Sequence, residues 1–194
     1  NIATAKTKWM NVPGSAVQNY IPRMEWSNKN EIIIQQLDRK QQVSKIMLLN
    51  AVSGLASLIN EEKDAAWIDI KSRWNNDDPT GWEWINEGKD FLWVSEKDGW
   101  RHIYSINLAT KKETLLTSGN YDMIGFGAID QANGYVYFTA SPNNALQQYL
   151  YRVSLKGDGK AELISPADLK GTHSYQISPT GVFARHSFSN ISTM

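Results

Sequence analysis

The chain contains no cysteine, and its 20 lysine and arginine residues balance its 20 aspartate and glutamate residues. The absence of cysteine excludes disulfides, thiolate metal sites and a cysteine nucleophile. The balanced charge leaves no net positive field to attract a phosphate polyanion, and no cluster of basic residues stands out along the sequence. We therefore expect no nucleic-acid partner.

Long hydrophobic runs are missing as well. No stretch approaches the roughly 18 apolar residues of a membrane-spanning helix, and residues 1–6 lack the apolar core of a signal peptide. We expect no membrane span in this segment. The chain also has no initiator methionine and begins in the middle of a pattern, so we expect it to be a segment of a longer polypeptide.

The sequence does have the composition of a folded protein, with 41% hydrophobic and 11% aromatic residues. Its apolar residues recur in a repeat. The first two copies open at Trp26 and Trp84 and place their apolar runs at 32–34, 46–49 and 58–59, and at 91–94, 103–108 and 115–116. The second copy follows the first by 57 or 58 residues, a third follows after a further 45 to 48, and a fourth begins at Ile177.

Within each copy the apolar residues alternate with more polar ones, which is the period of a β-strand. Turn sequences such as Asp98-Gly99 and Asn133-Gly134 separate the runs. Each copy therefore predicts four short antiparallel strands, and tandem four-stranded units of this length are typical of propeller blades. One such sheet cannot cover both of its apolar faces, so neighbouring blades pack face to face. A β-sandwich, the alternative, would show no internal period.

We therefore predict an all-β fold, a partial β-propeller of about three four-stranded antiparallel blades plus flanking strands. The predicted parts are the end of one blade, three blades and the start of the next, at 1–20, 21–81, 82–127, 128–174 and 175–194. The segment Lys6–Met10 is expected to be the last strand of the preceding blade. Extra residues between Trp67 and Trp82 lengthen the first period, which indicates a loop insertion.

One predicted hairpin has a distinctive sequence, Phe91-Leu92-Trp93-Val94-Ser95-Glu96-Lys97-Asp98-Gly99-Trp100-Arg101-His102-Ile103-Tyr104. It resembles the hairpin signature of the dipeptidyl peptidase IV family, whose members join an eight-bladed propeller to an α/β-hydrolase domain. The segments 19–26, 149–152 and 171–181 resemble parts of the neighbouring blades. The resemblance covers nearly the whole chain.

The resemblance implies the C-terminal part of the propeller of an exported serine exopeptidase. It also implies that the propeller narrows access to a buried active site, so that loose peptide ends enter and folded proteins do not. It implies removal of N-terminal dipeptides or tripeptides that end in proline, and a periplasmic or cell-envelope location. The implied partners are peptide substrates, the remaining blades and the missing hydrolase domain. Because the terminal blades of a partial ring expose apolar faces, self-association is also expected.

The chain itself shows no complete catalytic site. The Gly-x-Ser-x-Gly elbow of an α/β-hydrolase is absent, so we assign no catalytic residue and expect the chain alone to be inactive. Ser174 follows His173, but adjacent residues on a strand point to opposite faces. The three histidines have no metal-like spacing, and we expect neither a metal nor a cofactor. In the hairpin we expect Arg101 and His102 to hold a turn.

Two further sets of residues are weighed as substrate contacts. Glu61 and Glu62 form the kind of pair with which the family grips a substrate ammonium, but their sequence context differs, and we expect them in a solvated turn. In relatives the insertion after a closing tryptophan contributes to the substrate pocket, and Arg73 and Trp74 are the candidates here, although their order and spacing depart from the pattern.

The alternative function is a free-standing propeller that binds a protein or glycan partner.

Overall fold

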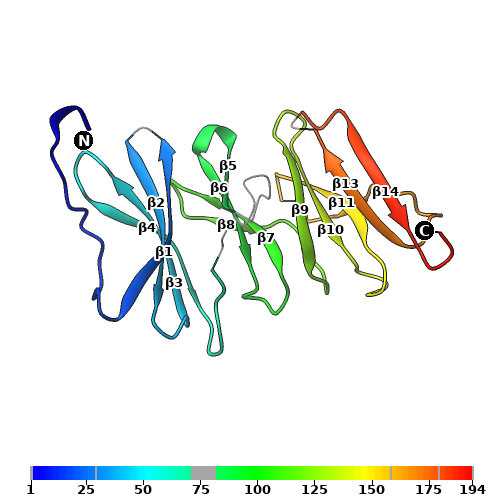
Figure 1. Ribbon diagram of the computed structural model, residues 1–194, viewed down its shortest axis with the longest axis horizontal. Helices are drawn as coiled ribbons and strands as arrows, with labels where there is room; N and C mark the ends of the chain where they lie inside the picture. The colour runs from blue at the N-terminus through cyan, green and yellow to red at the C-terminus, as the bar shows by residue number, and fades with distance from the viewer. Residues whose placement is uncertain (1, 29, 71–81, 158, 179, 194) are drawn as a thin grey trace. The chain divides into compact units, whose positions relative to one another are not determined.

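The computed structural model describes residues 2–28, 30–70, 82–157, 159–178 and 180–193. The chain divides into two compact units, Asn1–Ser72 and Arg73–Met194, and Figure 1 shows that strands dominate both. The helical turns of the described residues are two short 3-10 segments, η1 (Ile2–Thr4) before the first strand and η2 (Asn86–Gly88), which follows Ile85 and precedes Asp90. Among the described residues, no helix has the length and apolar character needed to cross a membrane.

The first unit contains one four-stranded antiparallel sheet, in which neighbours in sequence are neighbours in space (Figure 1). Its strands are β1 (Asn19–Asn28), β2 (Glu31–Asp38), β3 (Val43–Asn50) and β4 (Ala56–Lys63). Side chains at the turns explain this meander. Asp38 Oδ1 accepts hydrogen bonds from the backbone N–H groups of Gln42 and Val43, at 2.7 and 2.9 Å. Such local bonds close a turn without help from distant residues.

One face of this sheet carries a small core of Ile34, Met47 and Leu49, against which Met10 and Val12 pack. The prediction of a strand over Lys6–Met10 is wrong, because these residues have no strand conformation. Only Asn11 pairs, through a single parallel bridge to Leu55. Pro13 follows two residues later and has no N–H to donate, so a regular ladder cannot continue there.

The second unit contains two four-stranded antiparallel sheets and a hairpin. The first sheet consists of β5 (Trp82–Ile85), β6 (Asp90–Ser95), β7 (His102–Asn107) and β8 (Glu113–Leu115). The second consists of β9 (Met123–Asp130), β10 (Tyr135–Ala140), β11 (Tyr149–Ser154) and β12 (Glu162–Leu163). The hairpin consists of β13 (Thr172–Ile177) and β14 (Ala184–Ser189). The short outer strands β8 and β12 limit the sheet edge available for pairing with other chains.

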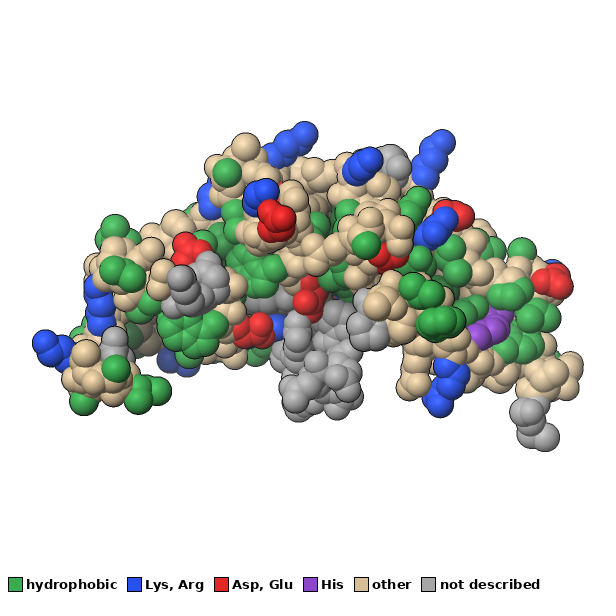
Figure 2. Space-filling view, turned by 90° about the horizontal axis from the view of Figure 1, so that it is seen from above, with side chains coloured by type: hydrophobic (Ala, Val, Ile, Leu, Met, Phe, Trp, Pro, Cys, Tyr) green, Lys and Arg blue, Asp and Glu red, His purple; other side chains and the backbone are tan. Residues whose placement is uncertain are grey.

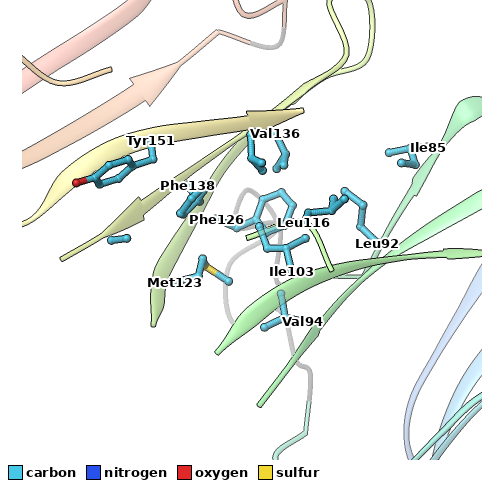
Figure 3. Packing of buried hydrophobic residues seen from close by; sticks show 12 residues of the cluster. Ile85, Leu92, Val94, Ile103, Leu116, Met123, Phe126, Val136, Phe138 and Tyr151 are labelled. Atoms are coloured by element: carbon cyan, nitrogen blue, oxygen red, sulfur yellow. The ribbon is translucent and has the colours of Figure 1, made fainter. Parts of the chain in front are cut away.

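The two sheets of the second unit pack face to face around one apolar cluster (Figure 3). Leu92 and Ile103 contribute to it from the first sheet, and Val136 and Phe138 from the second; all four are fully buried. In β10 buried residues alternate with half-buried ones, whereas in β6 the neighbours of Leu92 are fully buried as well. Burial of apolar surface between the sheets is the main force that holds them together.

The all-β prediction, with about three four-stranded antiparallel sheets and flanking strands, is confirmed. The fourth copy of the repeat forms the β13–β14 hairpin. The exact blade boundaries stay a prediction. Sequence periodicity found the sheets because their central strands carry apolar runs, which alternate with less buried residues in β10, and because turn residues separate the runs.

Candidate functional site

The β6–β7 hairpin, which carries the distinctive sequence, closes through a turn over residues 96–99. The N–H of Gly99 donates to the carbonyl of Glu96 at 2.9 Å. Gly99 has a φ of 93°, a conformation that side chains with a Cβ atom rarely adopt. Ser95 Oγ accepts a hydrogen bond from the N–H of Lys97 at 3.2 Å. The glycine and the serine hydroxyl thus serve the turn itself.

Asp98 and His102 form the central contact of this hairpin. Oδ2 of Asp98 lies 2.8 Å from Nδ1 of His102, and a carboxylate only accepts, so the histidine carries a proton on Nδ1. Oδ1 of Asp98 also accepts from the N–H of Trp100 at 3.3 Å. Burial acts to raise the pKa of Asp98, but the hydrogen bonds from His102 and Trp100 outweigh it, so the pKa lies below its ordinary value.

The other ring nitrogen of His102 points into the protein. Within the described residues, neither Nε2 of His102 nor the hydroxyl of Tyr121 has a hydrogen-bond partner, and both atoms are buried. The two rings meet edge to face with centroids 5.9 Å apart. Burial raises the pKa of Tyr121, and the nearby Tyr151 adds to the effect. The His102 ring is therefore fixed by packing on one side and by Asp98 on the other.

The next residues tie the hairpin to the following sheet. The N–H of Arg101 donates to Oδ1 of Asp122 at 2.7 Å, and the carbonyl of Arg101 accepts from the N–H of Met123 at 2.8 Å. The Arg101 guanidinium reaches the carbonyl of Ile124 at 3.4 Å. At the tip of the hairpin, Glu96 and Trp100 are exposed. The arrangement joins two consecutive sheets and leaves the tip available for contacts.

None of the three histidines hydrogen-bonds a hydroxyl group in the part of the chain that the structure describes. His102 contacts Asp98, whereas His173 contacts His186 and the carbonyl of Leu169. Ser174 is exposed and the adjacent His173 is buried, in agreement with the expectation that they lie on opposite faces of a strand. The described residues therefore hold no pair of a histidine base and a hydroxyl nucleophile. They also contain no group of three or more potential metal ligands.

The acidic pair occupies a different place from the expected one. Glu61 and Glu62 lie within β4, and the prediction of a solvated turn is wrong. Glu61 forms ion pairs with Lys45 and Lys63, which are its neighbours across and along the sheet, while Glu62 is buried. The polar sequence gave no strand signal here. The strand continues because both glutamates keep the antiparallel register with β3.

The two candidate pocket residues, Arg73 and Trp74, lie outside the described residues. The contact between His173 and His186 was missed by sequence reasoning. These residues are 13 positions apart, and only the pairing of β13 with β14 brings them together. The one signal in the sequence was the turn residue Gly181, after which a second strand is expected to return beside the first and bring the two histidines close together.

The chain matches, over residues 1–194, a family model described as the dipeptidyl peptidase IV (DPP IV) N-terminal region. It is similar to a crystal structure of Porphyromonas gingivalis dipeptidyl peptidase 4, with a TM-score of 0.79 and 26% identity, over 97% of this chain and 25% of that one. The fold and the sequence thus agree on the same group of proteins.

Curated fungal proteins named "Probable dipeptidyl-aminopeptidase B" are also similar. The protein from Fusarium vanettenii is 27% identical over 155 residues, which is 75% of this chain and 16% of that protein. The protein from Aspergillus clavatus is 23% identical over 140 residues, 68% of this chain and 15% of that protein. The chain therefore spans about a sixth of the length of these relatives.

Proposed function

Because the chain belongs to the family of dipeptidyl peptidase IV N-terminal regions, we propose that it is a propeller segment of a serine exopeptidase. In this proposal the whole protein removes dipeptides or tripeptides that end in proline from the amino terminus of peptides. The segment acts as a scaffold that admits and docks the substrate, and the nucleophile belongs to a separate α/β-hydrolase domain. An exported protein of the periplasm or cell envelope would meet such peptides.

The observation that carries this proposal is a match along the full chain to the N-terminal region of the family, combined with the contacts of the histidines. In the described residues every histidine is engaged by a carboxylate, a second histidine or a carbonyl. A serine peptidase needs a histidine beside the attacking hydroxyl. The segment therefore fits a role in access rather than in bond cleavage.

The stacked sheets support a role in steric selection. Stacked sheets with apolar faces form a rigid wall, and a rigid wall with a narrow entrance admits a flexible peptide end but not a folded domain. Selection then comes from exclusion of the wrong substrate rather than from tight binding of the right one. The exposed tip of the β6–β7 hairpin is one place on such a wall where contacts with substrate or with the hydrolase domain are available.

The first unit also presents a surface suited to another blade. Met24, Trp26 and Leu58 are 65%, 63% and 48% exposed, and their cross-strand partners place them on the same face as Ile34 and Met47. Exposed apolar side chains gathered on one sheet face indicate a surface that another element covers. We propose the preceding blade of the whole protein as that element, and a second copy of the chain when the blade is missing.

Activity assays on two proteins test the main proposal. We expect the whole protein to release the chromophore from a chromogenic dipeptide that ends in proline, and the isolated chain to release none. A free amino terminus should be required, so the same substrate with a blocked amino group serves as the control. Turnover by the purified chain would place the nucleophile within it, and failure of the whole protein with every proline substrate would remove the proposed activity.

A further inference from the structure

The β13–β14 hairpin contains a compact group of rings around His173. The ring centroids of Tyr149, His186 and Phe188 lie 5.0, 5.1 and 4.9 Å from that of His173. Tyr175 stacks on His186 at 4.4 Å with an angle of 7° between the rings. His173 is fully buried, whereas His186 is exposed, and Figure 2 shows histidine atoms at the surface among hydrophobic side chains.

The hydrogen bonds fix the proton positions on both imidazoles. Nε2 of His173 lies 2.8 Å from the carbonyl oxygen of Leu169, which only accepts, so Nε2 carries a proton. In the neutral ring Nδ1 is then an acceptor, and it lies 2.9 Å from Nε2 of His186. His186 therefore donates from Nε2. The rings are nearly coplanar, at 1°, which aligns this N–H with the acceptor lone pair.

Charged groups in contact with the two rings would be needed to compensate a second positive charge on the pair. In the described parts of the chain, no carboxylate and no lysine or arginine forms an ion pair with either ring. The titratable groups that face the rings are the phenols of Tyr149 on β11 and Tyr175 on β13.

The pair consequently tolerates one added proton but not two. A proton on Nδ1 of the exposed His186 leaves its Nε2–H bond to His173 in place, and the resulting cation stacks on Tyr175. A second proton must go to Nδ1 of His173. It would place two N–H groups and two positive charges against each other, one of them on a buried ring, and the hydrogen bond would be lost.

We propose that His173 and His186 form an acid-sensitive latch on the β13–β14 hairpin. The latch joins three pieces of backbone. His173 holds the carbonyl of Leu169 in the segment before β13, its own carbonyl accepts from the Gln148 side chain at 3.2 Å, and its Nδ1 holds β14 through His186. Loss of the bond between the histidines removes this side-chain link, leaves only the backbone pairing between β13 and β14, and so loosens the hairpin.

Hydrogen exchange of the β13–β14 amides, measured by mass spectrometry on the full chain and corrected for intrinsic exchange rates, tests this proposal. The first proton, taken up in the ordinary imidazole range, should leave exchange unchanged; between about pH 7 and about pH 4, a range that extends to the disfavoured second protonation, exchange in this hairpin should accelerate about fivefold, as expected for the loss of one hydrogen bond. The β6–β7 hairpin in the same sample provides an internal reference, because its histidine is bound to a carboxylate.

Three substitutions separate the latch from general acid effects. His186→Gln should remove the pH response. The NH2 group of the glutamine amide can donate a hydrogen bond to Nδ1 of neutral His173, and after a 180° rotation of the amide its oxygen can accept one from protonated His173. His186→Leu can do neither, so its hairpin should exchange quickly at both pH values. Ser187→Ala changes an exposed neighbour whose side chain lies on the opposite face of β14 and should behave as the unchanged chain does.

A pH response that persists in His186→Gln would overturn the proposal, as would equal protection of the unchanged hairpin at the two pH values. Nitrogen-15 spectra of the three histidines supply a second readout that does not depend on stability. They should show a proton on Nε2 and none on Nδ1 of His173 near neutral pH. The opposite tautomer would also contradict the latch.

Discussion

Replacing Phe138 by alanine tests whether the sheets of the second unit are held together by the apolar cluster between them. Phe138 is fully buried, and its ring stacks between Tyr121, at 6.5 Å and 3°, and Tyr151, at 5.9 Å and 25°. It lies on β10 and faces side chains of the preceding sheet, including Leu92 and Ile103 (Figure 3).

The expected cost follows from the atoms removed and the space left behind. Truncation of a buried phenylalanine to alanine lowers the free energy of unfolding by about 3 to 5 kcal/mol. The two aromatic contacts account for part of this, at about 0.5 to 1.5 kcal/mol each. Phe138→Leu keeps most of the volume and should cost no more than about 1.5 kcal/mol. Phe183→Ala removes the same group from a side chain that is 76% exposed and should change stability by less than about 0.5 kcal/mol.

Urea unfolding followed by circular dichroism gives the free energies, and hydrogen exchange of the β10 amides shows whether the loss falls on the second unit. The order of stability should be Phe183→Ala, then Phe138→Leu, then Phe138→Ala. If Phe138→Ala costs less than about 1 kcal/mol, or no more than Phe183→Ala, the ring cannot be in a close-packed layer, and the stacked-sheet account of this unit fails.

Two further predictions concern the Asp98–His102 contact and the exposed face of the first sheet. The pKa of Asp98 is lowered in the folded state, so the ionised side chain stabilises the fold above the unfolded-state pKa of about 3.9, and this stabilisation is lost as pH falls through the lower folded-state value. In a plot of the urea midpoint against pH, Asp98→Asn should therefore show a smaller decrease at acid pH than the unchanged chain. Parallel curves for the two proteins would contradict this. Trp26→Glu should abolish self-association of the isolated chain, measured as the molar mass by light scattering at increasing concentration, because it places a charge on the exposed apolar face. Leu146→Glu, at an exposed position of the second unit, is its control, and an unchanged chain that stays monomeric would remove the proposed contact.

Local patterns in the sequence were sufficient to locate the main strands of the sheets. The alternation of apolar residues and the turn residues between the runs determine where strands such as β7 and β10 begin and end, because both signals act between residues close in the chain. The hairpin at Asp98 and Gly99 belongs to the same class, since its hydrogen bonds join residues within four positions of each other. The family resemblance was carried by this hairpin.

Contacts between distant residues were decided by tertiary structure alone. Pairing of β3 with β4 makes the polar Glu61–Glu62 sequence part of a strand. The segment Lys6–Met10, by contrast, forms no strand, and only the neighbouring Asn11 makes a bridge, to Leu55. The His173–His186 bond exists because two strands return side by side. Sequence by itself determined the repeating unit, since strand and turn propensities are local; the packing of the units and the partners of each polar group depend on the path of the whole chain.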